Sequence, residues 1–157
     1  MMGRTAFKQR TTRETDISLK LDLDGSGKSD INSGVPFFDH MLDGFARHGL
    51  FDLELKCRGD IEVDCHHTVE DCGIVLGTAI CEAVGDKKGI KRFGHFILPM
   101  DDALVLSAVD LSGRPYLDFR ADFKNDRCGA MDTDLFREFF YALSYSAMMN
   151  IHIQKKI

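Results

Sequence analysis

Asp64-Cys65-His66-His67-Thr68-Val69-Glu70-Asp71 is the stretch that organises this sequence, because it places metal-binding side chain types at the start of a long apolar segment. Apolar residues recur at helical spacing across residues 67–84, and Gly85-Asp86 closes the segment, so we predict a helix here. The residues expected to face inward are Ile74, Val75, Ala79, Ile80 and Ala83.

The spacing of the ionisable residues in this stretch indicates a metal site. On a helix, Glu70 shares a face with His66 at i, i+4 and with His67 at i, i+3. Imidazole and carboxylate donors suit Mn, Fe, Co, Ni or Zn. Adjacent histidines on a helix point about 100° apart, so they can serve one metal or two. The structural alternative is a polar helix start in which Glu70 is a capping-box partner.

Composition excludes several classes of protein. The 157-residue chain has a net charge of −5 and a pI of about 5.6, which argues against a nucleic-acid or anionic-membrane partner. We find neither an apolar run of about 18 residues nor a charged-then-apolar leader, so no membrane helix or signal peptide is expected. The five scattered cysteines fit reduced thiols and a cytoplasmic location.

Hydrophobic periodicity predicts a mixed α+β fold in a single compact domain, residues 1–157. The order strand-strand-helix-strand-helix suggests one unit used twice, in halves of about 1–90 and 91–157, with the second incomplete. Strands and helices do not alternate strictly along the chain, which favours an α+β fold over a doubly wound parallel sheet. Strands are expected at 5–12, 15–23, 51–57, near 93–98, 103–110, 115–123 and from residue 150, and helices at 36–48, 67–84 and 133–149.

Three further histidines are candidates for a site. His40 and His48 lie in the first helix, outside its apolar stripe, where a solvated histidine is the ordinary interpretation. His152 alternates with two isoleucines on the last strand, so it faces away from them. It is therefore either an edge residue or a residue that points into a site.

Two arginines and one glutamate complete the candidates. Arg114 lies in the tight Ser112-Gly113-Arg114-Pro115 loop, and Arg92 follows a Gly-Ile-Lys stretch. The forked guanidinium donors of such arginines suit a phosphate, although a surface arginine in a turn is the simpler interpretation. Glu14 lies between two strand segments, where a solvated carboxylate is the default.

Taken together, several segments resemble the imidazoleglycerol-phosphate dehydratase family of histidine biosynthesis. The resemblance covers residues 4–153, and its motifs occur in the order found in the family. They are Arg13-Glu14-Thr15, Phe38-Asp39-His40-Met41-Leu42 with His48-Gly49, Asp64 to Asp71, Gly89-Ile90-Lys91-Arg92-Phe93-Gly94 and Val109-Asp110-Leu111-Ser112-Gly113-Arg114-Pro115.

The resemblance implies a lyase that removes water from D-erythro-imidazole glycerol phosphate to give imidazole acetol phosphate. It implies a pair of divalent ions in each site, most often manganese. Glu14 and Glu70 are the implied catalytic residues, with Glu14 our first choice for moving protons. The implied metal ligands are His40, His66, His67, Glu70 and His152. The implied substrate-binding residues are Glu14, His40, His48, His66, His67, Glu70, Arg92 and Arg114.

The resemblance also implies an architecture and an assembly. The fold would be that of ribosomal protein S5 domain 2, with helices packed between or against mostly antiparallel sheets. Subunits would form trimers that join into an octahedral 24-mer and share metal ligands. The family carries a second His-His-x-x-Glu after the last strand, which this sequence lacks, so we expect this chain to be inactive or metal-free and to stop at the trimer.

From the residues alone, two other functions stay open. The same histidines and glutamates could activate water in a metallohydrolase, and a non-catalytic metal-binding oligomer could use them for storage. The order of the motifs and the two arginines favour the lyase, whose partner would be a small phosphorylated imidazole.

Overall fold

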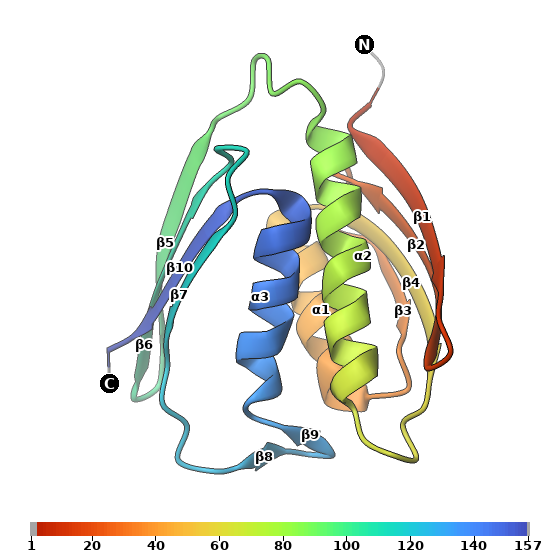
Figure 1. Ribbon diagram of the computed structural model, residues 1–157. Coiled ribbons are helices and arrows are strands. Elements are labelled where there is room, and N and C mark those ends of the chain that lie inside the picture. The colour runs from red at the N-terminus through yellow and green to blue at the C-terminus, as the bar shows by residue number, and fades with distance from the viewer. Residues whose placement is uncertain (1–2, 157) are drawn as a thin grey trace.

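A computed structural model describes residues 3–156 and shows three layers, with helices between two sheets (Figure 1). The strands of both sheets are mostly antiparallel, so the predicted α+β class and the placement of helices between sheets are confirmed. None of the helices in this part of the chain combines the length and apolar character needed to span a bilayer.

The first half contains one sheet and two helices. Its sheet has the strand order β1-β2-β4-β3, in which only β3 and β4 run parallel. The inner face carries Ile17, Leu19 and Leu21, all at most 2% exposed, under α2. The elements are β1 (Thr5–Thr11), β2 (Thr15–Asp22), β3 (Ser29–Asn32), α1 (Pro36–Gly49), β4 (Asp52–Gly59) and α2 (His66–Val84).

The second half repeats this topology with one helix. Its sheet has the order β5-β6-β10-β7, and only β7 and β10 run parallel. A small hairpin of two-residue strands precedes the helix. The elements are β5 (Phe93–Met100), β6 (Ala103–Asp110), β7 (Tyr116–Arg120), β8 (Arg127–Cys128), β9 (Met131–Asp132), α3 (Leu135–Ala147) and β10 (Asn150–Lys155).

Matching details connect the two halves. Leu50 directly follows α1 and Met148 directly follows α3, and both residues adopt left-handed backbone conformations with φ of 57° and 53° before the next strand begins. The Arg4 side chain, just before β1, bonds Asp24, and Arg92, just before β5, bonds Asp110 at the end of β6. An arginine–aspartate pair therefore joins the first two strands at one end of each sheet.

Helix α2 fills the centre because it is apolar on several sides. Four of the five predicted inward residues are buried, and Ile74 is half-buried. Gly73 and Gly77 bring the helix close to α3, since a Cβ on Gly77 would lie 2.7 Å from the Leu143 carbonyl oxygen. Glycine is required here for close helix packing.

The inner faces of the two sheets are covered differently. Helix α3 packs on β7 and β10, whereas β5, at the sheet edge, exposes Phe96 by 67% and Leu98 by 57%. A mostly apolar cavity of about 460 Å³ lies between the three helices and β6 and β10, with Met41 and Val109 in its lining. Among the described residues, no second helix covers β5 and β6 as α2 covers β1 and β2.

The structure corrects three predictions. The sequence prediction missed β3, so the first half begins with three strands and not two, and it also missed the β8–β9 hairpin before α3. These strands are short and have little apolar alternation; β3 reads Ser-Asp-Ile-Asn. Of the two interpretations of His152, the edge residue is wrong, because β10 lies inside its sheet, between β6 and β7.

Candidate functional site

The first turn of α2 carries the paired histidines on the lower end of the molecule in Figure 1. The Asp64 carboxylate accepts the His66 backbone amide at 2.7 Å, so Asp64 satisfies the helix end. His66 Nε2 lies 3.4 Å from Glu70 Oε2 one turn later. The capping-box interpretation of Glu70 is therefore wrong, and His66 and Glu70 form the pair that the spacing predicted.

His67 points to a different partner. Its Nδ1 lies 2.9 Å from the Asp60 carboxylate at the end of β4, and the ring centroids of His66 and His67 are 6.0 Å apart. The hydrogen bond to Asp60 raises the pKa of His67, and the charges of Asp60 and Glu14 act in the same direction. Sequence reasoning missed Asp60, although its place in the Gly-Asp turn after a strand was visible.

Glu14 lies at the same end, in the turn between β1 and β2. The Thr12 hydroxyl accepts the backbone amides of Glu14 and Thr15 at 3.1 and 2.9 Å, which fixes the shape of the turn. The next residue, Thr15, bonds Asp71 of α2, so the turn that carries Glu14 lies against the beginning of α2. The structure thus brings Glu14 to the start of α2.

The two histidines of α1 lie apart from this group and from each other. His40 is near the start of α1 and lines a small hollow with Asp30, Asp39 and Asp43, beside β3. His48 lies in the last turn, two helical turns further along. Within one chain, neither is joined to the α2 histidines by a described contact.

The arginines occupy the opposite end of the molecule. The Arg92 Nε and Nη2 atoms bond the two Asp110 oxygens at 2.6 and 3.1 Å, and the pKa of the Asp110 carboxyl is lowered as a result. The charges of Arg114 and Lys87 act on Asp110 in the same direction. Arg92 immediately precedes β5 and Arg114 lies in the loop between β6 and β7, so both belong to the end of the second sheet where Asp110 ends β6.

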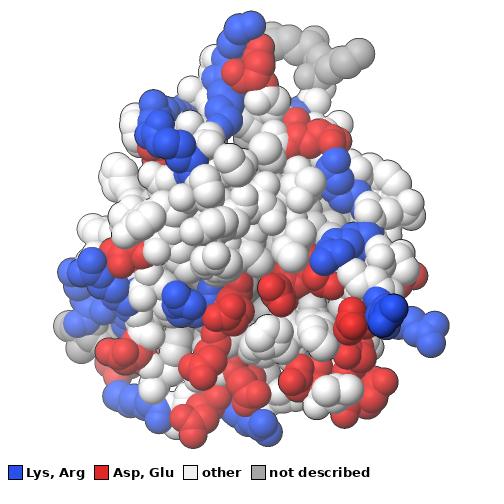
Figure 2. Space-filling view, viewed as in Figure 1, with Lys and Arg blue, Asp and Glu red and all other residues white. Residues whose placement is uncertain are grey.

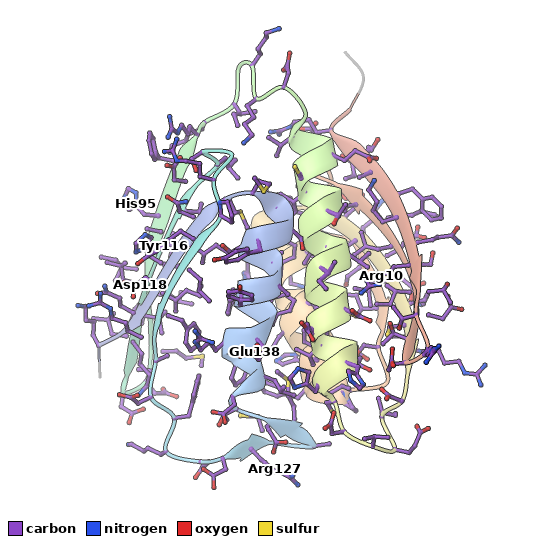
Figure 3. All side chains as sticks on the ribbon, viewed as in Figure 1. Arg10, His95, Tyr116, Asp118, Arg127 and Glu138 are labelled. Atoms are coloured by element: carbon purple, nitrogen blue, oxygen red, sulfur yellow. The ribbon has the colours of Figure 1, made fainter. Side chains whose placement is uncertain are left out.

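His152 lies on the outer face of the second sheet. It faces away from the helices, with Asp118 Oδ2 3.5 Å from its Nδ1 and the Tyr116 ring centred 5.5 Å away. Figure 3 shows Tyr116, Asp118 and His95 on this side of the sheet, and Arg10 on the other sheet, facing α2.

One chain therefore assembles part of the predicted site. Glu14, His66, His67 and Glu70 come together, whereas the remaining candidates lie elsewhere: His40, His48, Arg92, Arg114 and His152. Within residues 3–156, no three His, Cys, Asp or Glu side chains converge as a metal cage. The facing His66 and Glu70 side chains fit two adjacent positions around a borderline divalent metal, because their donors are of the right type.

The surface around this end is acidic. Figure 2 shows acidic side chains gathered over the lower part of the molecule, below a broad uncharged area. Asp60 and Asp64 lie between β4 and α2, next to the β8–β9 hairpin, whose Ala130 carbonyl accepts the Cys65 thiol, and Glu70 follows on α2. The local charge suits a cation better than an anion.

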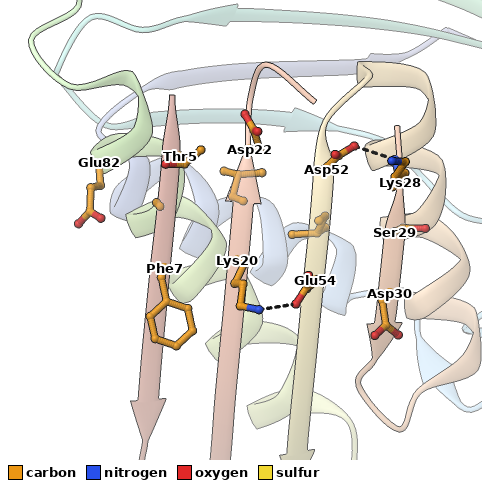
Figure 4. Close-up of a pocket in the computed structure, with 13 residues that line it drawn as sticks. Thr5, Phe7, Lys20, Asp22, Lys28, Ser29, Asp30, Asp52, Glu54 and Glu82 are labelled. Atoms are coloured by element: carbon orange, nitrogen blue, oxygen red, sulfur yellow. Dashed lines mark hydrogen bonds and ion pairs between the residues drawn. The ribbon is translucent and has the colours of Figure 1, made fainter. Parts of the chain in front are cut away.

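A separate hollow of about 680 Å³ lies on the outer face of the first sheet (Figure 4). Lys20 bonds Glu54 across it at 2.8 Å, and Asp52 accepts the Lys28 amide at 2.9 Å. None of the predicted site residues lines this hollow, so we do not place the site there.

Comparison with known proteins agrees with the sequence motifs. The family model for imidazoleglycerol-phosphate dehydratase matches residues 33–157. A relative with that name from Lachnoclostridium phytofermentans is 58% identical over 154 residues, covering 98% of this chain and 79% of the relative. Another from Shouchella clausii is 58% identical over 152 residues, covering 97% of this chain and 78% of the relative.

Solved structures show the same similarity. The crystal structure of the Staphylococcus aureus imidazoleglycerol-phosphate dehydratase superposes with a TM-score of 0.86 at 38% identity, over 96% of this chain and 83% of that one. The Pyrococcus furiosus structure gives 0.80 at 36% identity, over 94% of this chain and 78% of that one. These matches favour the lyase over the hydrolase and the storage oligomer.

Proposed function

The chain belongs to the imidazoleglycerol-phosphate dehydratase family of histidine biosynthesis, and from this premise we propose that its site works as a metal-dependent lyase. The substrate would be D-erythro-imidazole glycerol phosphate and the product imidazole acetol phosphate. The observation that carries the proposal is that the turn bearing Glu14 is bonded to the end of α2 that carries His66, His67 and Glu70.

The reaction explains why these residue types are needed. The substrate carbon that loses its proton has no carbonyl neighbour, so the electrons must move into the imidazole ring of the substrate. When bound, divalent metal ions, most often manganese, would act as Lewis acids on that ring. Loss of the ring N–H proton and of the hydroxide next to the ring would leave a conjugated diazafulvene-like species. Removal of the carbon proton, with a proton returned to the ring, would then give an enol that becomes the ketone, so the overall change is the loss of one water.

In this proposal the chain's own residues bind, orient and move protons. His66, His67 and Glu70 would hold the metal, and the Glu14 carboxylate would take and return the proton. Arg92 and Arg114 would hold the phosphate away from the reacting carbons and so supply positioning energy.

The scattered residues support a site shared between copies. His40, His48, His152 and the arginines are too widely placed to join Glu14 in one chain, so we propose that a homo-oligomer completes the site. A trimer is the expected unit, with the 24-mer as the larger assembly. The five free thiols support a reducing, cytoplasmic setting.

Metal binding can be measured on this chain directly. We expect His66→Ala to weaken the binding of Mn²⁺ by about tenfold or more, because a lost ligand removes a direct metal bond. His95→Ala is the matched control, since His95 lies on the outer face of β5, apart from α2. Equal Mn²⁺ affinity of the two variants, measured by titration calorimetry, would contradict the metal proposal.

Activity and assembly give a second test. With Mn²⁺ and imidazole glycerol phosphate, the product is detected by its enol absorbance in alkali. We expect turnover that requires Mn²⁺, and a trimer as the smallest stable particle by light scattering. Undiminished turnover after stringent chelation, or a large particle that forms without metal, would refute the respective part of the proposal.

A further inference from the structure

A directed chain of hydrogen bonds links the buried carboxylate of Asp71 on α2 to the Glu14 turn. The Thr15 hydroxyl, on the first residue of β2, lies 2.5 Å from Asp71 Oδ2. Thr15 is 3% exposed and Asp71 is 8% exposed, so water does not compete freely for this bond. On the other side, Arg10 Nη2 lies 3.0 Å from Asp71 Oδ1 and balances its charge.

The direction of the chain follows from counting donors. A threonine hydroxyl has one proton, and the Thr15 proton goes to the Asp71 carboxylate, which can only accept. The Thr12 hydroxyl, 3.2 Å from the Thr15 hydroxyl, must therefore donate to it. This orients the Thr12 lone pairs toward the backbone amides of Glu14 and Thr15, which it accepts at 3.1 and 2.9 Å.

The helix that supplies Asp71 is also the one that carries the candidate metal ligands. Asp71 follows Glu70 directly and lies one turn after His67, so its position is rigidly coupled to theirs. Figure 3 places Arg10 on β1, facing α2, which anchors the same carboxylate from the sheet. These bonds therefore hold the backbone of Glu14 in a fixed position relative to α2, the helix that carries the candidate metal ligands.

We propose that Asp71 is a positioning residue that, through the Thr15 and Thr12 hydroxyls, sets where the Glu14 carboxylate stands relative to His67 and Glu70. This inference rests on the proposed role of Glu14 in proton transfer. Asp71 does not touch the reacting atoms; it orders the turn that does. Because proton transfer tolerates little misplacement, loss of the chain lowers the rate of the chemical step more than it weakens substrate binding.

The first test measures the turn itself and needs no activity. In the full 157-residue chain, we expect Thr15→Val, which keeps the shape and removes the hydroxyl, to speed hydrogen exchange of the Glu14 amide by about tenfold. Thr15→Ser keeps the hydroxyl and should change the exchange rate of the Glu14 amide by no more than about twofold. Thr11→Val is the matched control, because it removes a threonine–carboxylate bond of 2.7 Å to Asp16 in the same hairpin.

Hydrogen exchange of the Leu19 and Leu55 amides, which lie in the core, distinguishes a general loss of stability from a local effect on the turn. If these speed up as much as the Glu14 amide in Thr15→Val, the effect is general and the positioning role is refuted. Unchanged exchange at Glu14 in Thr15→Val refutes it equally.

The second test uses the manganese-loaded assembly. We expect Thr15→Val to lower kcat about tenfold with KM within about twofold, Thr15→Ser to restore it, and Thr15→Val to add little in a Glu14→Gln background. If the fold-changes in kcat of Thr15→Val and Glu14→Gln multiply in the double variant, the two residues act independently and the inference is overturned. Full activity in Glu14→Gln would instead overturn the proposed function, while the exchange measurement still decides whether Asp71 orders the turn.

Discussion

The two halves share one strand order but bury their sheets to different extents. In the first half, α1 and α2 cover the inner face, and Leu19 and Leu55 are fully buried. In the second half, α3 covers β7 and β10, while Phe96 and Leu98 on β5 are mostly exposed. An alternating strand pattern alone therefore does not make a core; the helix laid across it does.

The largest expected difference concerns leucines on the two sheets. Leu55→Ala should lower the free energy of unfolding by about 3 kcal/mol, because it leaves a cavity under the helices. Leu98→Ala should cost less than about 1 kcal/mol, because this side chain is 57% exposed. Urea unfolding of both variants checks this, and equal losses would show that β5 is covered in solution.

Two helix glycines should respond with opposite signs. In Gly77→Ala the new Cβ would meet the Leu143 carbonyl 2.7 Å away, and we expect a loss of about 2 kcal/mol from overpacking between α2 and α3. In Gly44→Ala, on α1, the nearest atom is His48 Cδ2 at 4.0 Å, so helix propensity should add about 1 kcal/mol. Thermal unfolding measures both, and a loss in Gly44→Ala would mean that another chain already occupies that face of α1.

The smallest effect concerns the two arginine–aspartate clamps. The Arg4 side chain and amide hold the pKa of Asp24 at about 2, while the Arg92 guanidinium lowers the pKa of Asp110. A depressed folded pKa contributes stability above the unfolded pKa, and this stability is lost as the pH falls through the folded value. Both contributions should therefore fade below about pH 4.

The clamp of the first half should persist to lower pH, because Asp24 accepts a backbone amide as well as the guanidinium. We expect the difference in urea midpoint between wild type and Asp24→Asn to vanish only near pH 2, and that for Asp110→Asn at higher pH. Midpoints that are independent of pH between 2 and 6 would show that neither clamp stabilises the fold.

Local patterns in the sequence predicted most of the fold. The alternation of Ile17, Leu19 and Leu21 located β2, and the apolar stripe of α1 located that helix. Strand β3 was missed because Ile31 is its only apolar residue, and its pairing with β4 is parallel and non-local. The spacing of apolar residues within a short segment does not show which distant strand it will pair with.

The site was less predictable than the fold. The pairing of His66 with Glu70 follows from helical spacing, so it was found. The bond of Asp71 to Thr15 joins residues 56 positions apart, and it depends on how the β1–β2 turn meets α2. The roles assigned to His40, His152 and the arginines stay predictions, because they depend on how copies of the chain assemble.

The edge strand β5 has a practical consequence for handling the protein. An unpaired strand edge that carries Phe96, Ile97, Leu98 and Met100 in the open is a template for further strands, whereas the corresponding edge β1 alternates with Lys8 and Arg10. Aggregation on storage should therefore begin at β5, and a lysine introduced at Ile97 would act as a gatekeeper against it.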